Sequence, residues 1–185
     1  MKDWLGSPNP ITILDLSGVP SSMTNDIIGN VLRVLYDGLF WARKLSEGGR
    51  ERPLLIVMEE AHAYLNDNFD GAASLVTQRI VKEGRKYGAS LCIVTQRPAE
   101  IDPTILSQCN TVFALRMSND RDQEIDKSAI ADTGSGLLEF LSALGQREAI
   151  AFGDGVTLPV RIKFDELPAQ AMPKNSSARF SEMWQ

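Results

Sequence analysis

The chain has 185 residues, of which 43% are hydrophobic and 23% are charged, and its formal net charge is −5. This length and this balance fit one globular domain with a sizeable core, and they exclude a wholly disordered chain. The acidic balance does not suggest a nucleic-acid binder, although a ring-shaped motor can confine its basic residues to a narrow channel.

The first part of the chain predicts a strand followed by a long helix. Residues 11–16 are a mainly apolar, β-branched run that ends in a turn at residues 17–20. Between about residues 24 and 44, apolar residues recur every three or four positions, which indicates an amphipathic helix. Its expected buried face carries Ile28, Leu32, Leu35 and Leu39.

The middle of the chain predicts two strands joined by a helix. Residues 54–58 form a continuous apolar run without alternation, which is typical of a strand buried on both faces of a parallel sheet. A helix over about residues 72–87 ends at Gly88, and residues 90–95 form a second buried strand. Because Cys92 lies within this second run, we expect it to be a reduced thiol in the core.

The last part of the chain predicts shorter elements. Pro98 and Pro103 interrupt the chain, and a short helix follows them. Pro, Ala, Ser, Asn and Lys dominate after residue 167, so we expect residues 166–185 to be a weakly ordered tail. The other expected elements are a strand over residues 111–116, helices over residues 121–130 and 135–144, and a hairpin of residues 148–152 and 159–164.

The alternation of strands with crossover helices predicts an α/β fold, with three layers around a mainly parallel sheet and an antiparallel edge. No apolar run reaches the roughly 18 to 20 residues of a membrane span, and the N-terminus lacks the apolar core of a signal peptide. We therefore expect a cytoplasmic protein that makes no membrane contact.

Two acidic residues, Glu59 and Glu60, directly follow the apolar run of residues 54–58. Open α/β sheets bind ligands at the carboxyl ends of their strands, and an ionised carboxylate is costly to bury without a compensating cation or donor. A nucleoside-triphosphate motor needs one carboxylate to hold Mg²⁺ through water and another to orient and deprotonate the attacking water. The alternative is that the acids only cap the following helix.

Two further groups near the second strand fit the same interpretation. Gln96 follows that strand, and its amide can bond both the lytic water and a γ-phosphate, although a turn residue bonded to backbone is the alternative. Residues 79–86 contain four cations in eight positions. One interpretation is that these cations only stabilise the C-terminal end of a helix through its dipole. The other is that they include an arginine that reaches a γ-phosphate across a subunit interface, because only a guanidinium is a fixed, always-charged fork.

His62 is the only histidine in the chain. It follows Glu60 by two positions, so it forms no HExxH zinc pair, and no cysteine lies near it. A coupling or packing role beside the acids is the stronger interpretation. A metal hydrolase built from Glu59, Glu60 and His62 is a weaker alternative, because further ligands at suitable spacing are missing.

The phosphate-binding loop G-x-x-x-x-G-K-[ST] (Walker A) is missing, because Gly-Lys occurs nowhere in the chain. Residues 133–136 read Thr-Gly-Ser-Gly, but two leucines follow where Lys and Ser/Thr are required. The amides and lysine of such a loop supply most contacts to a triphosphate. We therefore expect the isolated chain to be inactive toward ATP.

The motifs resemble the HerA branch of the HerA/FtsK superfamily of hexameric DNA-pumping ATPases, over roughly residues 10–165. The family's N-terminal barrel and Walker A half would precede residue 1. The resemblance implies that residues 1–165 are the C-terminal portion of an incomplete RecA-like P-loop NTPase core of the ASCE type. The segments that carry the resemblance, in the family's order, are residues 13–20, 54–62, 83–88, 95–98, 106–110 and 144–161.

The resemblance implies ATP and Mg²⁺ as cofactors. Glu59 stands where many ATPases have the shorter Asp, which we interpret as a tolerated variant. The implied roles are the Walker B acid that holds Mg²⁺ through water for Glu59, the catalytic glutamate for Glu60, the polar sensor for Gln96, nucleotide binding for Thr95, and the trans-acting arginine finger for Arg85, with Arg79 in reserve.

The resemblance also implies a motor that threads duplex DNA through a homo-hexameric ring, and a nuclease such as NurA or a sirtuin-like effector in antiviral defence as partner. The alternative is a non-catalytic assembly module of a split or truncated motor, which lends Arg85 or Gln96 to a P-loop-bearing partner. A parallel sheet without its central strands exposes edges and apolar faces, so we expect the isolated chain to self-associate or dissolve poorly.

Overall fold

The computed structural model describes residues 10–46, 48–49, 51–66, 71–117 and 141–172. The longer helices in these ranges are α1 (Ser21–Trp41) and α2 (Ala72–Glu83), and α3 (Pro103–Leu106) is a short third one. The strands are β1 (Leu54–Met58), β2 (Ala89–Ile93), β3 (Thr111–Leu115), β4 (Glu148–Gly153) and β5 (Val160–Lys163).

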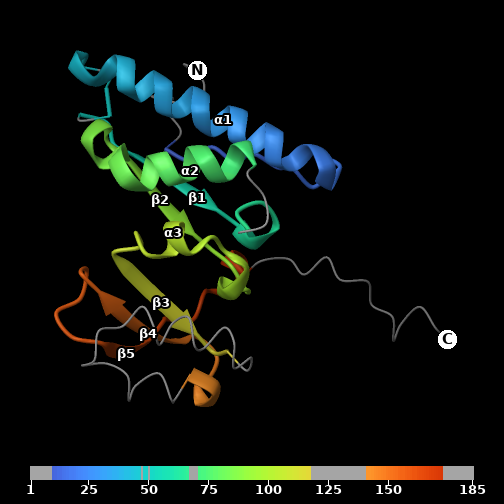
Figure 1. Ribbon diagram of the computed structural model, residues 1–185. Coiled ribbons are helices and arrows are strands. Elements are labelled where there is room, and N and C mark those ends of the chain that lie inside the picture. The colour runs from blue at the N-terminus through green and yellow to red at the C-terminus, as the bar shows by residue number, and fades with distance from the viewer. Residues whose placement is uncertain (1–9, 47, 50, 67–70, 118–140, 173–185) are drawn as a thin grey trace.

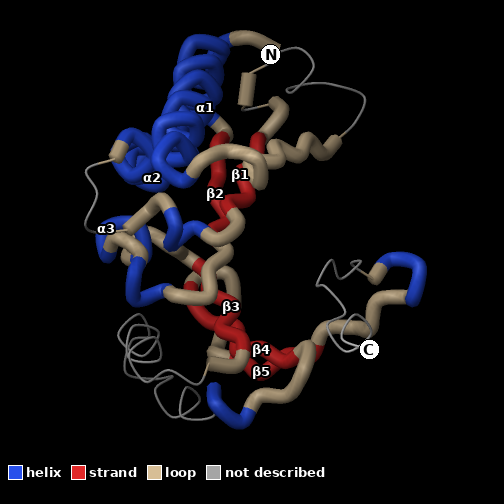
Figure 2. Tube along the Cα trace, turned by 90° about the vertical axis from the view of Figure 1, so that its right-hand side faces the viewer, coloured by secondary structure: helices blue, strands red, loops and turns tan. Residues whose placement is uncertain are grey.

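The strands of the described residues form two sheets. β1 and β2 pair in parallel, from Leu54 opposite Ala89 to Met58 opposite Ile93. β3, β4 and β5 form an antiparallel sheet in that order. Figures 1 and 2 show α1 and α2 packed on the β1–β2 sheet, the antiparallel sheet toward the other end of the molecule, and α3 between the two sheets. The α/β class and the C-terminal antiparallel hairpin are confirmed.

α1 is the amphipathic helix that the apolar spacing predicts. It begins directly after Pro20, and Leu35 is only half-buried. Gly29 lies where α1 approaches α2, because a Cβ at this position would be 2.6 Å from the Cβ of Ala72. The large side chains that α1 buries in the core are Ile28, Leu32, Tyr36 and Leu39.

The strand expected over residues 11–16 is absent, and that prediction is wrong. Ile11 and Ile13 are 76% and 85% exposed. A strand needs a neighbour to satisfy its backbone N–H and C=O groups, and no described segment pairs with these residues. Their apolar, β-branched side chains are therefore not sufficient to make a strand.

The described residues cover only one face of β1 and β2, so the expectation of strands buried on both faces is wrong for this part of the chain. Leu54 and Ile56 pack in the core, whereas Leu55 and Val57 are 60% and 53% exposed. Alternate side chains of a strand point to opposite faces, and α1 and α2 cover one of them. Cys92 is exposed, so the prediction of a core thiol is wrong as well.

Some expected elements lie outside the described residues. The helix over residues 121–130 is one of them, and only the end of the helix over residues 135–144 is described, as a 3₁₀ turn at Leu141–Ala143. The described part of the tail contains a 3₁₀ turn at Ala169–Ala171. Among the helices that the structure describes, none has the length and apolar composition of a membrane span.

Gly88 fixes the point at which β2 begins. Its backbone is left-handed, with φ at +76°, and a Cβ at this position would overlap the carbonyl of Gly49. Leu54 N donates a hydrogen bond to the Gly88 carbonyl at 2.8 Å. Glycine adopts this conformation without a steric penalty, so the turn holds the starts of β1 and β2 side by side.

We expect Gly88→Ala to lower the free energy of unfolding by at least about 2 kcal/mol, because left-handed strain adds to the overlap with Gly49. Urea denaturation followed by circular dichroism measures this change. Gly18→Ala is the matched control, since no atom lies within 4 Å of a Cβ at that position. Equal unfolding free energies for the two variants would contradict the packing at Gly88.

Candidate active site

The two acids that follow β1 lie in a tight turn. Glu60 has left-handed backbone angles, φ 48° and ψ 41°, which cost a non-glycine residue roughly 1–2 kcal/mol. Val94 N donates to Met58 O at 2.9 Å, and Ala61 N donates to Val94 O at 3.1 Å. These bonds tie the turn to the end of β2 and set Glu60 beside the segment that follows it.

Side chains from the two strand ends meet at Glu60. Gln96 Nε2 donates to one carboxylate oxygen of Glu60 at 2.9 Å. His62 Nδ1 lies 3.4 Å from the other oxygen and 3.1 Å from Thr95 Oγ1. The structure therefore brings together Glu60, Thr95 and Gln96, which the sequence assigns to one site. The contact of His62 with Thr95 had no signal in the sequence.

Glu59 differs from Glu60 in its contacts. Its carboxylate makes no hydrogen bond or ion pair to the described residues, while its backbone carbonyl accepts a bond from the Tyr64 hydroxyl at 2.7 Å. Burial, assisted by the charges of Glu59 and Glu60, raises the pKa of Tyr64 to about 12. The phenol therefore stays protonated at neutral pH and keeps donating to the Glu59 carbonyl. The Glu59 carboxylate has no partner among the described residues, so it is free for an external ligand.

The donor set around the acids fits magnesium better than zinc. No group of three His, Cys, Asp or Glu side chains suited to a metal occurs among the residues that the structure describes. Mg²⁺ commonly binds through one or two carboxylates together with waters and substrate phosphates, whereas zinc sites use three or four protein ligands. This argues against a metal hydrolase built from Glu59, Glu60 and His62.

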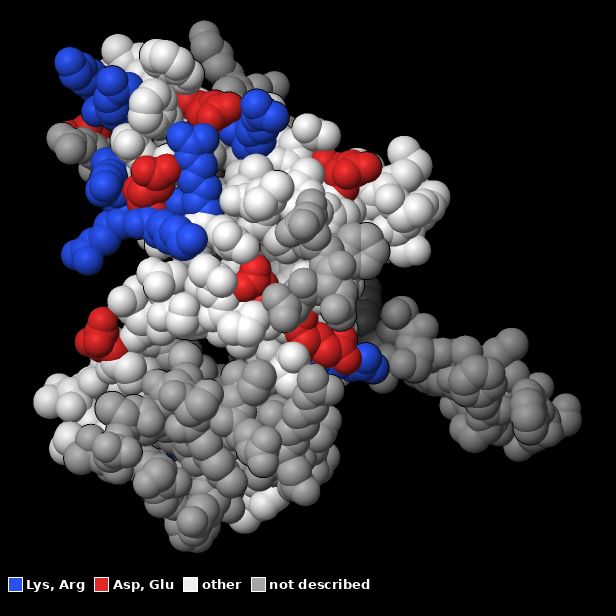
Figure 3. Space-filling view, viewed as in Figure 1, with Lys and Arg blue, Asp and Glu red and all other residues white. Residues whose placement is uncertain are grey.

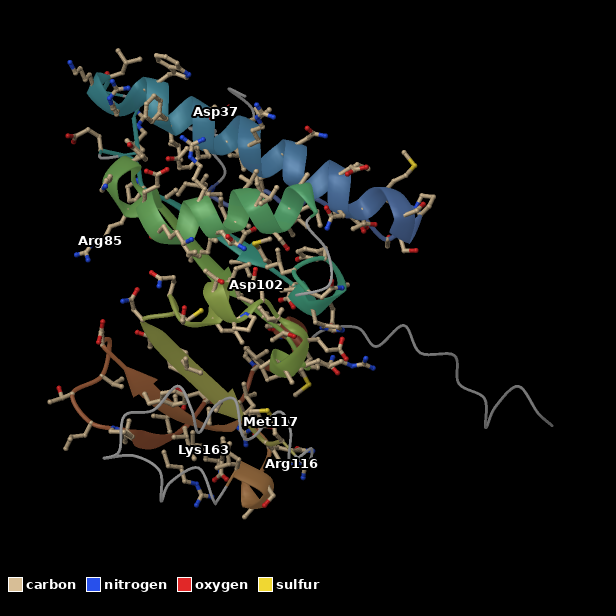
Figure 4. All side chains as sticks on the ribbon, in the orientation of Figure 1. Asp37, Arg85, Asp102, Arg116, Met117 and Lys163 are labelled. Carbon is tan, nitrogen blue, oxygen red and sulfur yellow. The ribbon has the colours of Figure 1, made fainter. Side chains whose placement is uncertain are left out.

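Asp102 holds the loop after β2 against α2. It is 8% exposed and accepts hydrogen bonds from Gln78 Nε2 at 2.6 Å and from Thr104 N at 2.7 Å. Figure 4 shows Asp102 in the middle of the molecule, below α2. An Asp before Pro103 is a signal for a helix N-cap, but the sequence did not indicate the bond to α2.

Arg85 lies at the opposite end of the parallel strands from Glu60. It belongs to the 3₁₀ turn Gly84–Tyr87 that precedes β2, and five residues of extended strand separate the two ends by roughly 15 Å. Figure 4 shows the Arg85 side chain pointing away from the body of the molecule. Within the described residues it has no hydrogen bond or ion pair, so it does not reach Glu60 of the same chain.

Arg79, in contrast, contacts other side chains of the same chain. Its Nε donates to Glu83 at 2.8 Å, and its guanidinium lies 4.7 Å from the centre of the Tyr36 ring. The Tyr36 hydroxyl donates to the same Glu83 oxygen at 2.8 Å. The hydrogen bonds from Arg79 and Tyr36 lower the pKa of Glu83, and burial together with the bond to Glu83 raises the pKa of Tyr36 to about 12.

Cations gather on the side of the molecule that α1 and α2 form (Figure 3). Arg33 and Arg79 line a groove of about 330 Å³ between the two helices. Lys82 and Lys86 line a neighbouring hollow along α2. Arg33 and Arg79 are paired with Asp37 and Glu83, so the positive charge that these hollows offer to an anionic partner comes from Lys82 and Lys86.

The chain is similar to archaeal helicases. It is 30% identical over 174 residues to the DNA double-strand break repair helicase HerA of Sulfolobus acidocaldarius, which covers 94% of this chain and 35% of that protein. It is 28% identical over 192 residues to HerA of Pyrococcus furiosus, which covers 89% of this chain and 35% of that protein. The chain thus spans about a third of the length of these relatives.

The genome packaging NTPase B204 of Sulfolobus turreted icosahedral virus 2 shares the fold. Its complex with ATP-gammaS aligns with a TM-score of 0.61 at 12% identity, over 88% of this chain and 70% of that one. Its complex with AMPPCP aligns with a TM-score of 0.56 at 12% identity, over 78% and 63% of the two chains. The predicted P-loop NTPase fold is therefore confirmed. No protein-family model matches the chain.

Proposed function

This chain is part of a HerA-like ATPase, and we propose that it carries the water-activating side of a nucleotide-hydrolysis site in an ATP-driven DNA translocase or helicase. The observation that carries this proposal is the bond of 2.9 Å between Gln96 and Glu60. It joins an amide and a carboxylate at the carboxyl ends of two neighbouring parallel strands, where open α/β sheets bind ligands.

Glu60 would act as the general base. The oxygen of the attacking water bonds to the γ-phosphorus, the bond from that phosphorus to the bridging oxygen of the β-phosphate breaks, and ADP and phosphate leave. The proton of the water passes to the Glu60 carboxylate. The Gln96 amide would donate to the γ-phosphate and accept from the water, and the Thr95 hydroxyl would bind the nucleotide beside it.

Glu59 would hold Mg²⁺ through the waters of the hydrated ion. Its carboxylate is exposed and lies one residue from the general base, without a bond to the described residues. When bound, the ion neutralises the negative charge on the β- and γ-phosphates. Glu59 would therefore bind the hydrated ion, and Glu60 would activate the water.

The phosphate-binding half of the site has to come from another segment or subunit, because the chain contains no G-x-x-x-x-G-K-[ST] loop. Val57 and Val94 are 53% and 39% exposed near the two strand ends that carry Glu60 and Gln96, and Leu55, near the start of β1, is 60% exposed. We expect the P-loop-bearing part to cover these side chains, since buried apolar area stabilises by roughly 25 cal/mol per Å². If that part is a separate protein, this chain is the assembly module of a split motor.

Arg85 would act on the nucleotide of a neighbouring subunit in a hexameric ring around duplex DNA. It has no partner in the described part of its own chain and points away from it (Figure 4), so an anion on another subunit suits it. Arg79 is the weaker candidate, because Glu83 and Tyr36 already hold it. A nuclease such as NurA or a sirtuin-like effector would complete the assembly.

Phosphate release from ATP with and without duplex DNA tests the proposal. We expect DNA to stimulate hydrolysis by the complete protein, and the 185-residue chain to hydrolyse no ATP because it lacks the phosphate loop. Recovery of hydrolysis after addition of a separate P-loop-bearing protein would favour the split motor. Metal-dependent hydrolysis by the isolated chain that ATP does not affect would contradict both versions.

A further inference from the structure

His62 occupies the junction between the two strand ends. Its Nδ1 atom lies 3.1 Å from Thr95 Oγ1 and 3.4 Å from a carboxylate oxygen of Glu60. The His62 side chain is 18% exposed, whereas that of Glu60 is 55% exposed. One nitrogen of a largely enclosed ring therefore contacts both the acid after β1 and the hydroxyl after β2.

The contacts of His62 favour a proton on Nδ1. An ionised carboxylate only accepts hydrogen bonds, so an unprotonated Nδ1 would face the lone pairs of Glu60. Thr95 Oγ1 accepts a bond from Arg97 N at 3.0 Å and has a second lone pair for another donor. A proton on Nδ1 would donate to Thr95 Oγ1 and would also face the Glu60 carboxylate at 3.4 Å, and hydrogen bonds such as the one to Thr95 set the tautomer of a histidine.

The direct bond between Gln96 and Glu60 belongs to a resting arrangement. A water held between these side chains makes one hydrogen bond to each of them, which places their polar atoms roughly 4.5 Å apart. In the structure these atoms are 2.9 Å apart, so the two side chains have to separate before water enters. Among the described residues, His62 is then the side chain that remains in contact with the Glu60 carboxylate.

We propose that His62 is a positioning residue for hydrolysis: its Nδ1–H holds the Glu60 carboxylate at the end of β2 while Gln96 turns toward the nucleotide. This inference rests on the proposed function, because it requires Glu60 to be the general base. Without His62, the Glu60 side chain, which is 55% exposed, is free to rotate away from the water that it activates.

The tautomer of His62 is the first test, and it needs no turnover. Because His62 is the only histidine in the 185-residue chain, ¹⁵N labelling of histidine in the untagged chain gives signals from one ring. We expect the proton of the uncharged ring to lie on Nδ1. Glu60→Gln, which removes the acceptor charge, should lower the Nδ1–H fraction. An unprotonated Nδ1 would overturn the inference, and so would a tautomer that this change leaves unaltered.

Kinetics of the assembled ATPase that contains this chain are the second test. We expect His62→Ala to lower kcat by about 10- to 100-fold and to leave KM for ATP within about threefold, because the base is misplaced while the nucleotide contacts remain. His62→Asn should restore most of kcat, since its amide nitrogen lies where Nδ1 lies. His62→Gln, whose amide nitrogen reaches further, should not.

The same experiment separates the two proposals. If Glu60→Gln abolishes hydrolysis and His62→Ala retains the wild-type kcat, His62 has no positioning role and the proposed function stands. Equal losses of kcat in His62→Ala and His62→Asn would also overturn the role, because they would indicate general damage to the turn. If Glu60→Gln hydrolyses ATP normally, the proposed function fails, and the inference about His62 fails with it.

Discussion

In the assembled ATPase that contains this chain, Glu60→Gln should lower the rate of ATP hydrolysis by roughly 10²- to 10⁴-fold, which is the usual contribution of a general base. Glutamine keeps the size of the side chain and the hydrogen bond from Gln96, but its amide does not accept a proton from water. Nucleotide binding should stay close to wild type, because the phosphate contacts come from other residues. Phosphate release and equilibrium binding of a labelled ATP analogue measure the two effects.

Glu166→Gln is the control for the loss of one negative charge. Glu166 is 70% exposed and pairs with Arg147 at 3.6 Å, and exposed ion pairs of this kind contribute little to stability. Its substitution should leave hydrolysis unchanged. Loss of nucleotide binding together with hydrolysis in Glu60→Gln would point to a binding role for Glu60, and undiminished hydrolysis would remove it from the mechanism.

Arg85→Ala should lower hydrolysis by about 10³- to 10⁵-fold in the assembled ring, which is the usual effect of losing an arginine finger. Arg85 sits on the turn before β2, roughly 15 Å from Glu60 along the strands, so its phosphate partner would belong to the next subunit. Arg85→Lys should recover little, because an ammonium lacks the fixed fork of a guanidinium. Lys86→Ala, on the same turn, controls for the loss of one positive charge.

Mixed rings test whether Arg85 acts across subunits. Each Arg85→Ala subunit keeps Glu60, and each Glu60→Gln subunit keeps Arg85, so one of the two interfaces between them contains a complete site. We expect the mixture to recover part of the hydrolysis that each variant loses alone. A mixture as inactive as its components would contradict action in trans. A large loss in Arg79→Ala with none in Arg85→Ala would transfer the role to Arg79.

Local sequence patterns were sufficient for the elements that carry the site. The apolar run over residues 54–58 correctly predicted β1, and the spacing of apolar residues predicted the buried face of α1. Gly88, which has a positive φ, ends the turn before β2. These elements depend on contacts between neighbours in the chain, and such contacts leave a visible period or a turn residue in the sequence. The acids after β1 and the amide after β2 could therefore be placed at one edge of a sheet.

Burial and strand pairing were harder to predict, because they depend on what lies next to a segment. Residues 11–16 have the composition of a strand and lack a partner in the described structure, while Leu55 and Val57 belong to an apolar run and are exposed. An apolar residue is buried only where another layer covers it, and no pattern within a single strand records that layer.

Side-chain partners depended entirely on the folded arrangement. Glu60 and Gln96 are 36 residues apart, and a parallel crossover brings them into contact. The same folding gives Arg79 a partner in Glu83 and leaves the Arg85 side chain without one in the described residues, although Arg79 lies on α2 and Arg85 on the 3₁₀ turn that directly follows it. Residue type and order were enough to place the acids and the amide at one edge of the sheet, whereas the distances between them and the pairing of each arginine follow from how the strands and helices pack.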